Sequence, residues 1–318
     1  MGEVAAIVMA SGAGLAMALQ SPTNGSLGTR IGAHRATIVN FLGGEILLVL
    51  AVALFGTGDL TQLAVVPWWQ FLGGFYGIAV VLAVATATPV LGVALSLTAV
   101  MLGQVSGGMV IDAFGWFETQ RQPLDALRVL GCLATLVGIV FVYISRQRLQ
   151  KGLGGQADAP FRVDGAALRL LALVFCSGVL SAIQSPTNAA LVRHVGSLEA
   201  PLVNFTVGLA LALVVGAVTS RMHGERLLPP VQDLRGTSPW QYTGGVYGVA
   251  IVILAVRSTP VIGVGLMVTC QMLGQLGGGM VIDAFGLMRT PRVRMDGWRI
   301  AGVGAIGLGI VLVALGEM

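Results

Sequence analysis

The segment Gly107–Gly115 has the sequence GGMVIDAFG, and the segment Gly278–Gly286 repeats it without a change. Two residues before each copy stands the tripeptide Leu-Gly-Gln, which ends at Gln104 in the first half and at Gln275 in the second. Chance does not produce a match of this length at a spacing of 171 residues in a chain of 318. The sequence therefore predicts one structural module that is present twice.

The match extends along most of both halves. At the same spacing the matched pairs are Trp69 and Trp240, Gly73 and Gly244, Tyr76 and Tyr247, Asp125 and Asp296, and Arg128 and Arg299. Nearer the start of each half the spacing is 164 residues, and the matched pairs there are Gln20 and Gln184, Pro22 and Pro186, Asn24 and Asn188, Asn40 and Asn204, and Phe41 and Phe205. The change of spacing predicts a net insertion near 220–238 of the second half.

The composition is that of a membrane protein. Hydrophobic residues make up 55% of the chain and charged residues 10%, and the mean hydropathy is +0.87. A soluble domain carries roughly 25% charged residues. The segment 60–111 contains no Asp, Glu, Lys or Arg. A helix crosses a bilayer with about 20 apolar residues, so this segment holds two membrane spans.

Apolar segments occur five times in each half. They cover 4–27, 36–56, 66–87, 89–112 and 126–145 in the first half, and 168–191, 201–219, 240–256, 260–283 and 298–316 in the second. We predict an all-α membrane protein with ten transmembrane helices, arranged as two inverted five-helix repeats. The first repeat is 1–145, the second is 168–318, and the polar, Gly-rich segment 146–167 links them.

Prolines occupy equivalent places in the two halves. Pro22 and Pro186 fall inside the first helix of each half, where the missing N–H is expected to kink the helix. Thr88-Pro89 and Thr259-Pro260 are expected to form tight turns between the third and fourth helices.

The distribution of basic residues predicts the orientation. Five crossings per module place the second copy upside down relative to the first. Of the 18 Lys and Arg residues, fourteen lie in or beside the loops of one side. By the positive-inside rule these loops are cytoplasmic, so both termini are predicted to lie outside the cytoplasm.

The order of short motifs in each half resembles a known family. Each half has Gln-xxx-Asn near the end of its first helix and Asn-Phe early in its second. A Trp, a Gly-Gly pair and Tyr-Gly follow, and then Gly-Gln and Asp-xx-Gly near the end of the fourth helix. This order resembles the YdcZ-like family of five-helix modules in the drug/metabolite transporter superfamily, and because it occurs twice the chain looks like a fused two-module member. The resemblance implies a multi-pass protein of the bacterial inner membrane that acts as a secondary transporter.

Polar side chains within the spans are the candidate binding residues. Inverted repeats place a substrate site near the bilayer midplane, often at broken helices. Gln20 and Asn24 share one helix face and flank Pro22, whose kink frees a carbonyl. The predicted substrate-binding residues are Gln20, Asn24, Asn40, Tyr76, Gln104, Gln184, Asn188, Asn204, Tyr247 and Gln275. The alternative is that the amides bond to one another across helices and stabilise the bundle.

Acidic residues are rare within the predicted spans. Glu45 is the acid that lies well inside one, and its equivalent is Leu209. A charge at mid-bilayer costs about 2.5–3.5 kcal/mol on insertion scales, so Glu45 is the candidate proton-coupling residue. The alternative is a protonated Glu45 that bonds to a neighbouring helix. Asp112 and Asp283 end the fourth helices, where a capping role or an ion pair with a loop arginine is favoured.

The pattern favours transport over catalysis. The sequence contains no catalytic set, metal-ligand cluster, cofactor motif or basic nucleic-acid face, so we expect neither an enzyme nor a metal, cofactor or nucleic-acid partner. The expected partners are a small-molecule substrate and the lipid bilayer, for a monomer, with a homodimer as the alternative. Because no Lys or Arg lies deep in the spans, we expect a neutral or cationic organic metabolite or drug, moved by alternating access. An ion or small-solute channel that uses the same cavity is the alternative.

Overall fold

The fold was analysed in a computed structural model that describes residues 2–91, 93–122, 124–152, 165–224, 226–227, 229, 235–289 and 296–315. Within these residues the secondary structure is helical, without a strand. The first half contains α1 (Glu3–Ile31), α2 (Ala33–Phe55), η1 (Leu60–Ala64), η2 (Trp68–Leu72), α3 (Gly73–Leu91), α4 (Val93–Phe114), η3 (Trp116–Glu118) and α5 (Ala126–Gly152). The second contains α6 (Gly165–Val195), α7 (Glu199–His223), η4 (Pro239–Tyr242), α9 (Gly244–Phe285), η5 (Leu287–Arg289) and α10 (Gly297–Leu315).

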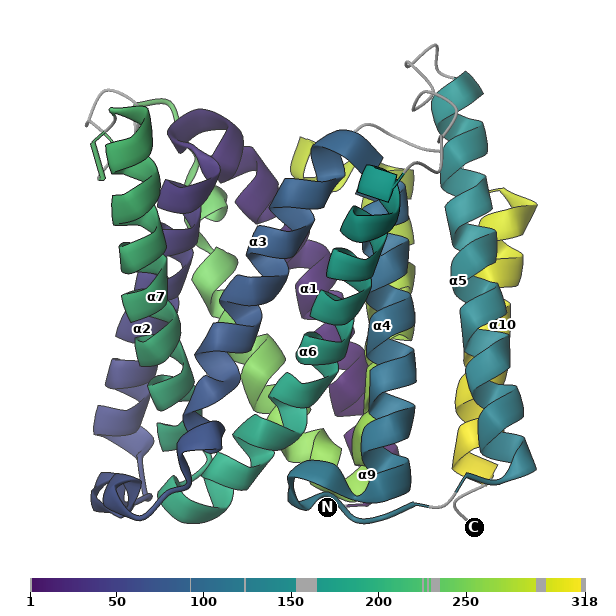
Figure 1. Cartoon of the computed structure of the whole chain (residues 1–318), viewed down its shortest axis with the longest axis horizontal. Coiled ribbons are helices and arrows are strands. Elements are labelled where there is room, and N and C mark those ends of the chain that lie inside the picture. Colours follow the sequence, from purple (N-terminus) through teal and green to yellow (C-terminus); the bar gives the residue numbers. More distant parts are fainter. Residues whose placement is uncertain are drawn as a thin grey trace.

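Six of the described helices are long and apolar enough to cross a membrane: α1, α2, α4, α6, α7 and α9. The apolar parts of α3, α5 and α10 are shorter. In Figure 1 the helices stand side by side as one layered bundle, and the two chain ends lie at the same edge. These features agree with the predicted all-α membrane class.

The second half corrects one predicted turn. Pro260 lies inside α9, and the helical geometry breaks three residues later at Gly263, which has φ 71° and ψ 174°. A proline's fixed φ is compatible with helix, whereas this combination of φ and ψ is essentially restricted to glycine. Pro89 likewise lies inside α3. In the second half the turn thus forms at Gly263, which can adopt this conformation, rather than at the Thr259-Pro260 dipeptide.

The expected linker is shorter than 146–167. Helix α5 continues to Gly152 and α6 begins at Gly165, and residues 153–164 lie outside the described part of the chain. A helix that leaves the bilayer keeps its own backbone hydrogen bonds in water, and residues such as Arg146, Gln147 and Arg148 favour helix. The polar composition therefore does not mark the end of the helix.

The two halves interlock rather than stand apart. Helix α1 packs on α9, α6 packs on α3 and α4, α2 pairs with α7, and α5 pairs with α10. A Cβ on Gly178 of α6 would overlap the Val100 carbonyl of α4, and one on Gly14 of α1 would overlap the Gln271 carbonyl of α9. These are equivalent contacts, and they allow the close backbone approach that drives helix association in lipid.

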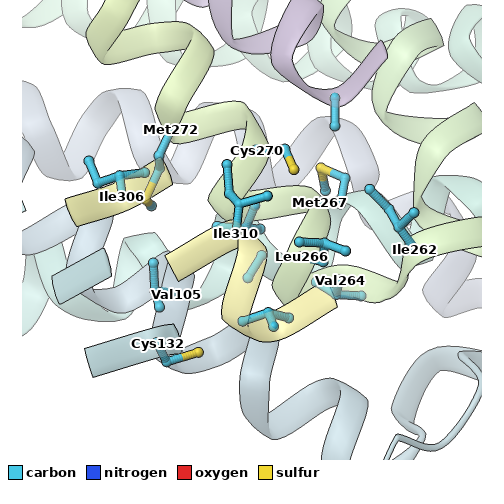
Figure 2. Packing of buried hydrophobic residues seen from close by; sticks show 14 of the residues in the cluster. Val105, Cys132, Ile262, Val264, Leu266, Met267, Cys270, Met272, Ile306 and Ile310 are labelled. Atoms are coloured by element: carbon cyan, nitrogen blue, oxygen red, sulfur yellow. The ribbon is translucent and has the colours of Figure 1, made fainter. Parts of the chain in front are cut away.

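Among the described residues, the buried apolar cluster with the most members joins α4, α5, α9 and α10, and it also includes Ala6 and Ala10 of α1 and Ala182 of α6. Figure 2 shows side chains such as Val105, Cys132, Met267 and Ile306 packed together. The cluster holds the four helices together on the side of the bundle where α5 and α10 stand in Figure 1.

The loops are held by equivalent residues of opposite charge. Glu199 is buried at the start of α7, and its Oε1 accepts from the Gly58 N–H in the loop after α2 at 2.8 Å. The equivalent residue is Arg35, near the start of α2, whose Nη2 donates to the Arg226 carbonyl in the loop after α7 at 2.6 Å. A carboxylate therefore binds a backbone N–H in one half, and a guanidinium binds a backbone carbonyl in the other.

Candidate functional site

Gln20 and Gln184 each form a hydrogen bond that joins the two halves. Gln20 Nε2 of α1 donates to the carbonyl of Gly244, the first residue of α9, at 3.0 Å. Gln184 Nε2 of α6 donates to the carbonyl of Gly73, the first residue of α3, at 2.8 Å. The two bonds join equivalent atoms, but the donor lies in the first half in one bond and in the second half in the other. Both glutamines thus bond to the backbone of the opposite half rather than to each other.

Asparagines complete a cluster around Gly244. The Oδ1 atoms of Asn24 and Asn40 occupy the space that a side chain on Gly244 would need. A Cβ on Gly244 would stand 2.6 Å from Asn40 Oδ1 and closer to Asn24 Oδ1. Only glycine leaves space for both oxygens. We name Gln20, Asn24, Asn40 and Gly244 the Gly244 cluster.

The same arrangement surrounds Gly73. The Oδ1 atoms of Asn188 and Asn204 occupy the space that a Gly73 Cβ would need. Both oxygens are buried and have no hydrogen-bond partner among the described atoms. Because an unpartnered buried amide is costly, it calls for a water or a ligand. We name Gln184, Asn188, Asn204 and Gly73 the Gly73 cluster.

The two clusters lie toward opposite faces and differ in exposure. Helix α3 begins at the face of the two chain ends, whereas α9 begins at the other face (Figure 1). Tyr76, beside the Gly73 cluster in sequence, is buried, and its equivalent Tyr247 is half-buried. Asn188 and Asn204 are also buried, whereas Asn24 and Asn40 are half-buried. The predicted binding residues are therefore divided between two places instead of meeting in one.

The fourth-helix glutamines have different surroundings. Gln104 is buried and its Nε2 donates to Ser181 Oγ of α6 at 2.7 Å. Gln275 is half-buried on α9. The residue equivalent to Ser181 is Met17, which cannot return the same bond, and Met17 Sδ instead accepts from Gln271 at 2.9 Å. The symmetry of the sequence therefore does not extend to this contact.

Glu45 lies at the seam between α2 and α7. Its Oε1 accepts from Thr206 Oγ1 at 2.7 Å, and its Oε2 has no partner among the described atoms. Glu45 is half-buried, Thr206 is exposed, and the following Ile46 also faces outward. The carboxyl group thus accepts a hydrogen bond from a neighbouring helix.

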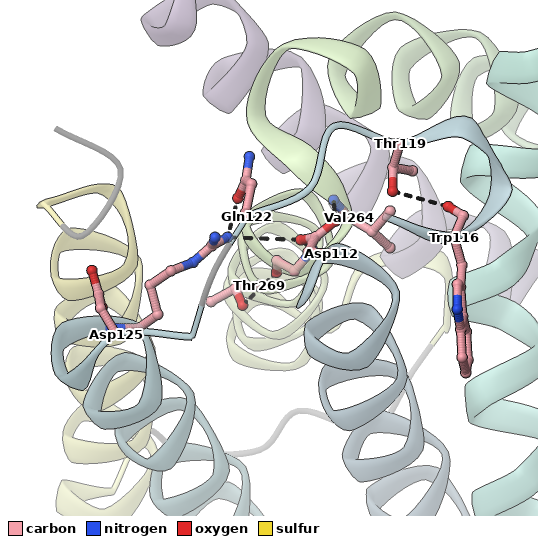
Figure 3. Close-up of polar contacts among 9 residues, drawn as sticks. Asp112, Trp116, Thr119, Gln122, Asp125, Val264 and Thr269 are labelled. Atoms are coloured by element: carbon pink, nitrogen blue, oxygen red, sulfur yellow. Dashed lines mark hydrogen bonds and ion pairs between the residues drawn. The ribbon is translucent and has the colours of Figure 1, made fainter. Parts of the chain in front are cut away.

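Asp112 caps the second part of α9. Its Oδ1 accepts from the Val264 N–H at 2.8 Å and its Oδ2 from the Gly265 N–H at 2.6 Å. Arg128 Nη2 lies 3.8 Å from Oδ2. Figure 3 shows Asp112 close to Gln122 and Val264. The favoured capping and ion-pair roles are both confirmed for Asp112. The side chain of Asp283 lies outside the described residues.

Sequence reasoning missed the burial of two arginines. Arg128 and its equivalent Arg299 lie in the first turns of α5 and α10 and are almost fully buried. Their backbone N–H groups bond to Asp125 and Asp296, at 2.7 and 3.0 Å. The Asp-xx-Arg spacing, repeated in both halves, was the available signal. Because Arg128 pairs with Asp112, its charge is not free for an anion.

A cavity of about 180 Å³ opens beside these residues. It lies between the loop around η3, the C-terminal half of α6 and the bend of α9. Its lining residues are Phe117, Glu118, Thr119, Gln120, Gln122, Pro186, Ala189, Arg193, Thr259, Pro260 and Gly263. None of the ten predicted binding residues is among them, although Pro186 stands between Gln184 and Asn188.

An ion pair crosses the rim of this cavity. Arg193 Nη2 of α6 contacts Glu118 Oε2 of η3, and the two side chains are 48% and 47% exposed. The fully buried Gln70 lies behind them, with its Nε2 3.5 Å from Glu118 Oε1. No spacing rule connects these residues in the sequence, because they meet only through the packing of α6 against the first half.

The comparisons with known proteins agree with this architecture. The family model described as "Putative inner membrane exporter, YdcZ" matches residues 5–141 and again 169–312. A solved structure described as "Crystal structure of protein" superposes with a TM-score of 0.70 over 99% of this chain and 98% of that chain, at 15% identity, which is a likeness of fold. No curated protein matches the chain. The two family matches cover most of the chain, one in each half, and the chain therefore belongs to the YdcZ family.

Proposed function

We propose that the protein is a secondary transporter of the inner membrane that moves a small neutral or cationic organic solute by alternating access. The family description and the apolar helices support a transporter in that membrane rather than an enzyme. In the proposal, ten helices form two inverted five-helix repeats, 1–145 and 168–318. Their equivalent contacts, made in reverse order, support this arrangement.

The observation that carries the proposal is a hydrogen bond that occurs at equivalent positions in both halves. Alternating access needs a pathway that opens at one face while it is closed at the other. The Gln20–Gly244 and Gln184–Gly73 bonds are equivalent and lie toward opposite faces. One of them can break while the other holds, because each ties the first helix of one half to the third helix of the other.

The chemistry of the two clusters supports the substrate class. Their amide oxygens and nitrogens can bond to a neutral or cationic solute, and the unpartnered oxygens of Asn40, Asn188 and Asn204 are acceptors. The buried Arg128 is paired with Asp112, so it offers no free charge for an anion. Glu45 is the proposed proton-coupling acid, because one carboxylate oxygen has no partner.

The test begins with a thermal-shift screen of the purified protein against neutral and cationic metabolites. A compound that binds the folded state stabilises it by RT ln(1 + [L]/Kd). The compound that stabilises most is then added in radiolabelled form outside proteoliposomes, either empty or preloaded with the unlabelled compound. We expect saturable uptake with counterflow, weakened in Gln184→Ala and unchanged in Ser21→Ala, which removes an exposed hydroxyl beside Gln20. Flux that neither saturates nor shows counterflow would favour the channel alternative.

A further inference from the structure

The Glu118–Arg193 ion pair joins the two halves at the rim of the cavity. Glu118 ends η3 in the first half, and Arg193 lies in the last turn of α6 in the second. Both side chains are about half exposed. If the contact opens, each charge is taken up by water rather than left buried and unpaired, so opening carries a small energetic cost.

The loop that carries Glu118 has a restricted backbone. Phe117 and Glu118 have φ values of 59° and 61°, in the left-handed region that side chains other than glycine rarely adopt. The equivalent of Phe117 in the second half, Met288, has φ 55°. Gln70, behind the loop, bonds to the second carboxylate oxygen of Glu118. Glu118 thus keeps a hydrogen-bond partner, Gln70, when the Arg193 side chain moves away.

The equivalent positions in the other half have different chemistry. Arg193 corresponds to Thr29, and Glu118 corresponds to Arg289. A threonine and an arginine cannot form an ion pair. The two halves therefore differ at this contact. An ionic contact between these positions can form at one face only.

The floor of the cavity leads toward the Gly73 cluster. Pro186 lines the cavity and is two residues from both Gln184 and Asn188. Ala189, on the same helix, also lines it and is 5% exposed. A solute that passed between Glu118 and Arg193 would thus meet the end of the bundle where Gln184 bonds to Gly73.

From these observations we propose that this cavity is one mouth of the transport pathway and that Glu118 and Arg193 form its gate. The proposal rests on the transport function proposed above. The gate opens when the Arg193 guanidinium leaves the carboxylate, which is held by Gln70. The equivalent positions at the opposite face, Thr29 and Arg289, cannot form this ion pair, so the pair sets the relative population of conformations open at this face.

The test measures access to the cavity directly, without a substrate. Ala189→Cys is placed in a background in which Cys132, Cys176 and Cys270 are replaced by alanine. Its reaction with a membrane-impermeant maleimide is followed in right-side-out and inside-out membrane vesicles. Gly2→Cys, at the same face in Figure 1, identifies the side to which the gate belongs.

We expect Arg193→Gln and Glu118→Gln each to raise the rate of labelling at position 189 several-fold, by about fivefold for a half-exposed pair. The exchange E118R/R193E restores the contact and returns the rate to the parent value, since Gln70 Oε1 has no described partner and can accept from the new arginine. Arg193→Lys and the control Glu3→Gln, which removes an exposed charge at the same face, leave the rate unchanged.

The dependence of labelling on salt provides a second measurement of the same contact. Raising the ionic strength from about 0.15 M to 1 M shortens the screening length from about 8 Å to 3 Å. Labelling of Ala189→Cys is expected to accelerate in salt when the gate is intact and to be insensitive to salt in Arg193→Gln. Equal rates in the parent and both single variants, or an exchange variant as fast as the singles, would overturn the gate. Faster labelling in a protein that moves no solute would instead retain the gate and overturn the transport function.

Discussion

Phe41 of α2 and Phe205 of α7 are equivalent residues, and their rings pack against each other with centroids 5.5 Å apart and planes inclined at 56°. Each ring also fills the space beside a glycine of the opposite helix, Phe205 at Gly44 and Phe41 at Gly208. Mutual contact between equivalent residues is what a twofold relation between two copies produces. A single substitution in this contact between α2 and α7 therefore disturbs the packing of the two halves against each other.

Gly44→Ala is expected to lower the thermal unfolding midpoint, because the new Cβ would overlap the Phe205 ring. Gly43→Ala is the matched control on the same helix, since the atom nearest to its new Cβ would be the Tyr242 carbonyl oxygen at 4.0 Å. Alanine favours helix over glycine by about 1 kcal/mol, so the control should be neutral or slightly stabilised. Unfolding of the purified variants in one detergent compares them. Equal midpoints for the two variants would contradict the assigned packing.

Asp112→Ala is expected to destabilise the fold strongly. It leaves two backbone N–H groups and the buried Arg128 without their partner, and breaking a buried ion pair costs about 3–5 kcal/mol. Asp125→Ala removes an exposed helix cap in the same region, which costs about 0.5–2 kcal/mol. Denaturation of the two variants side by side measures the difference. A larger loss in Asp125→Ala would contradict the role assigned to Asp112.

Glu45→Gln is expected to abolish uptake driven by a pH gradient while counterflow of the same solute persists. Glutamine keeps an oxygen that can accept from Thr206 but cannot exchange a proton. Thr206→Val is the control, because it removes the hydrogen bond and keeps the carboxyl group. Initial rates in proteoliposomes with and without an imposed pH gradient provide the measurement. Uptake by Glu45→Gln that still follows the gradient would remove Glu45 from coupling.

Cysteines at Arg146 and Arg289 are expected to react from the cytoplasmic side, and a cysteine at Gly2 from the opposite side. The basic loops and the chain ends are predicted to lie at different faces. A membrane-impermeant thiol reagent, applied to intact and then to permeabilised cells, distinguishes the two sides. Reaction of the cysteines at 146 and 289 from different compartments would contradict the inverted repeat.

The sequence predicts those features that repetition and hydropathy determine. Composition and the apolar segments were enough to predict the membrane class, and the order of motifs around the exact repeat GGMVIDAFG was enough to predict the family. A capping role or an ion pair was predicted for Asp112 from its place at the end of the fourth helix, and both contacts are present. The doubled Gln and Asn residues were identified as a set, but their partners were not. Gln20 and Gln184 bond to glycine carbonyls. A backbone acceptor cannot be predicted from the pattern of side chains in the sequence.

Features that depend on tertiary packing could not be predicted in this way. The bend at Gly263 rather than at Thr259-Pro260 follows from a backbone conformation that many glycines in this chain could adopt. The Glu118–Arg193 contact forms because α6 of one half lies against the first half. Charges in loops were interpreted as orientation signals, and nothing in their spacing shows that two of them share the rim of a cavity.

The loop contacts of Arg35 and Glu199 carry a consequence for how such a protein can change. Each residue anchors a loop of the opposite half, the cation through a carbonyl and the anion through an N–H. Exchanging the two charges would therefore remove both anchors at once. Neither half can take the place of the other at these two contacts, although the two residues occupy equivalent positions.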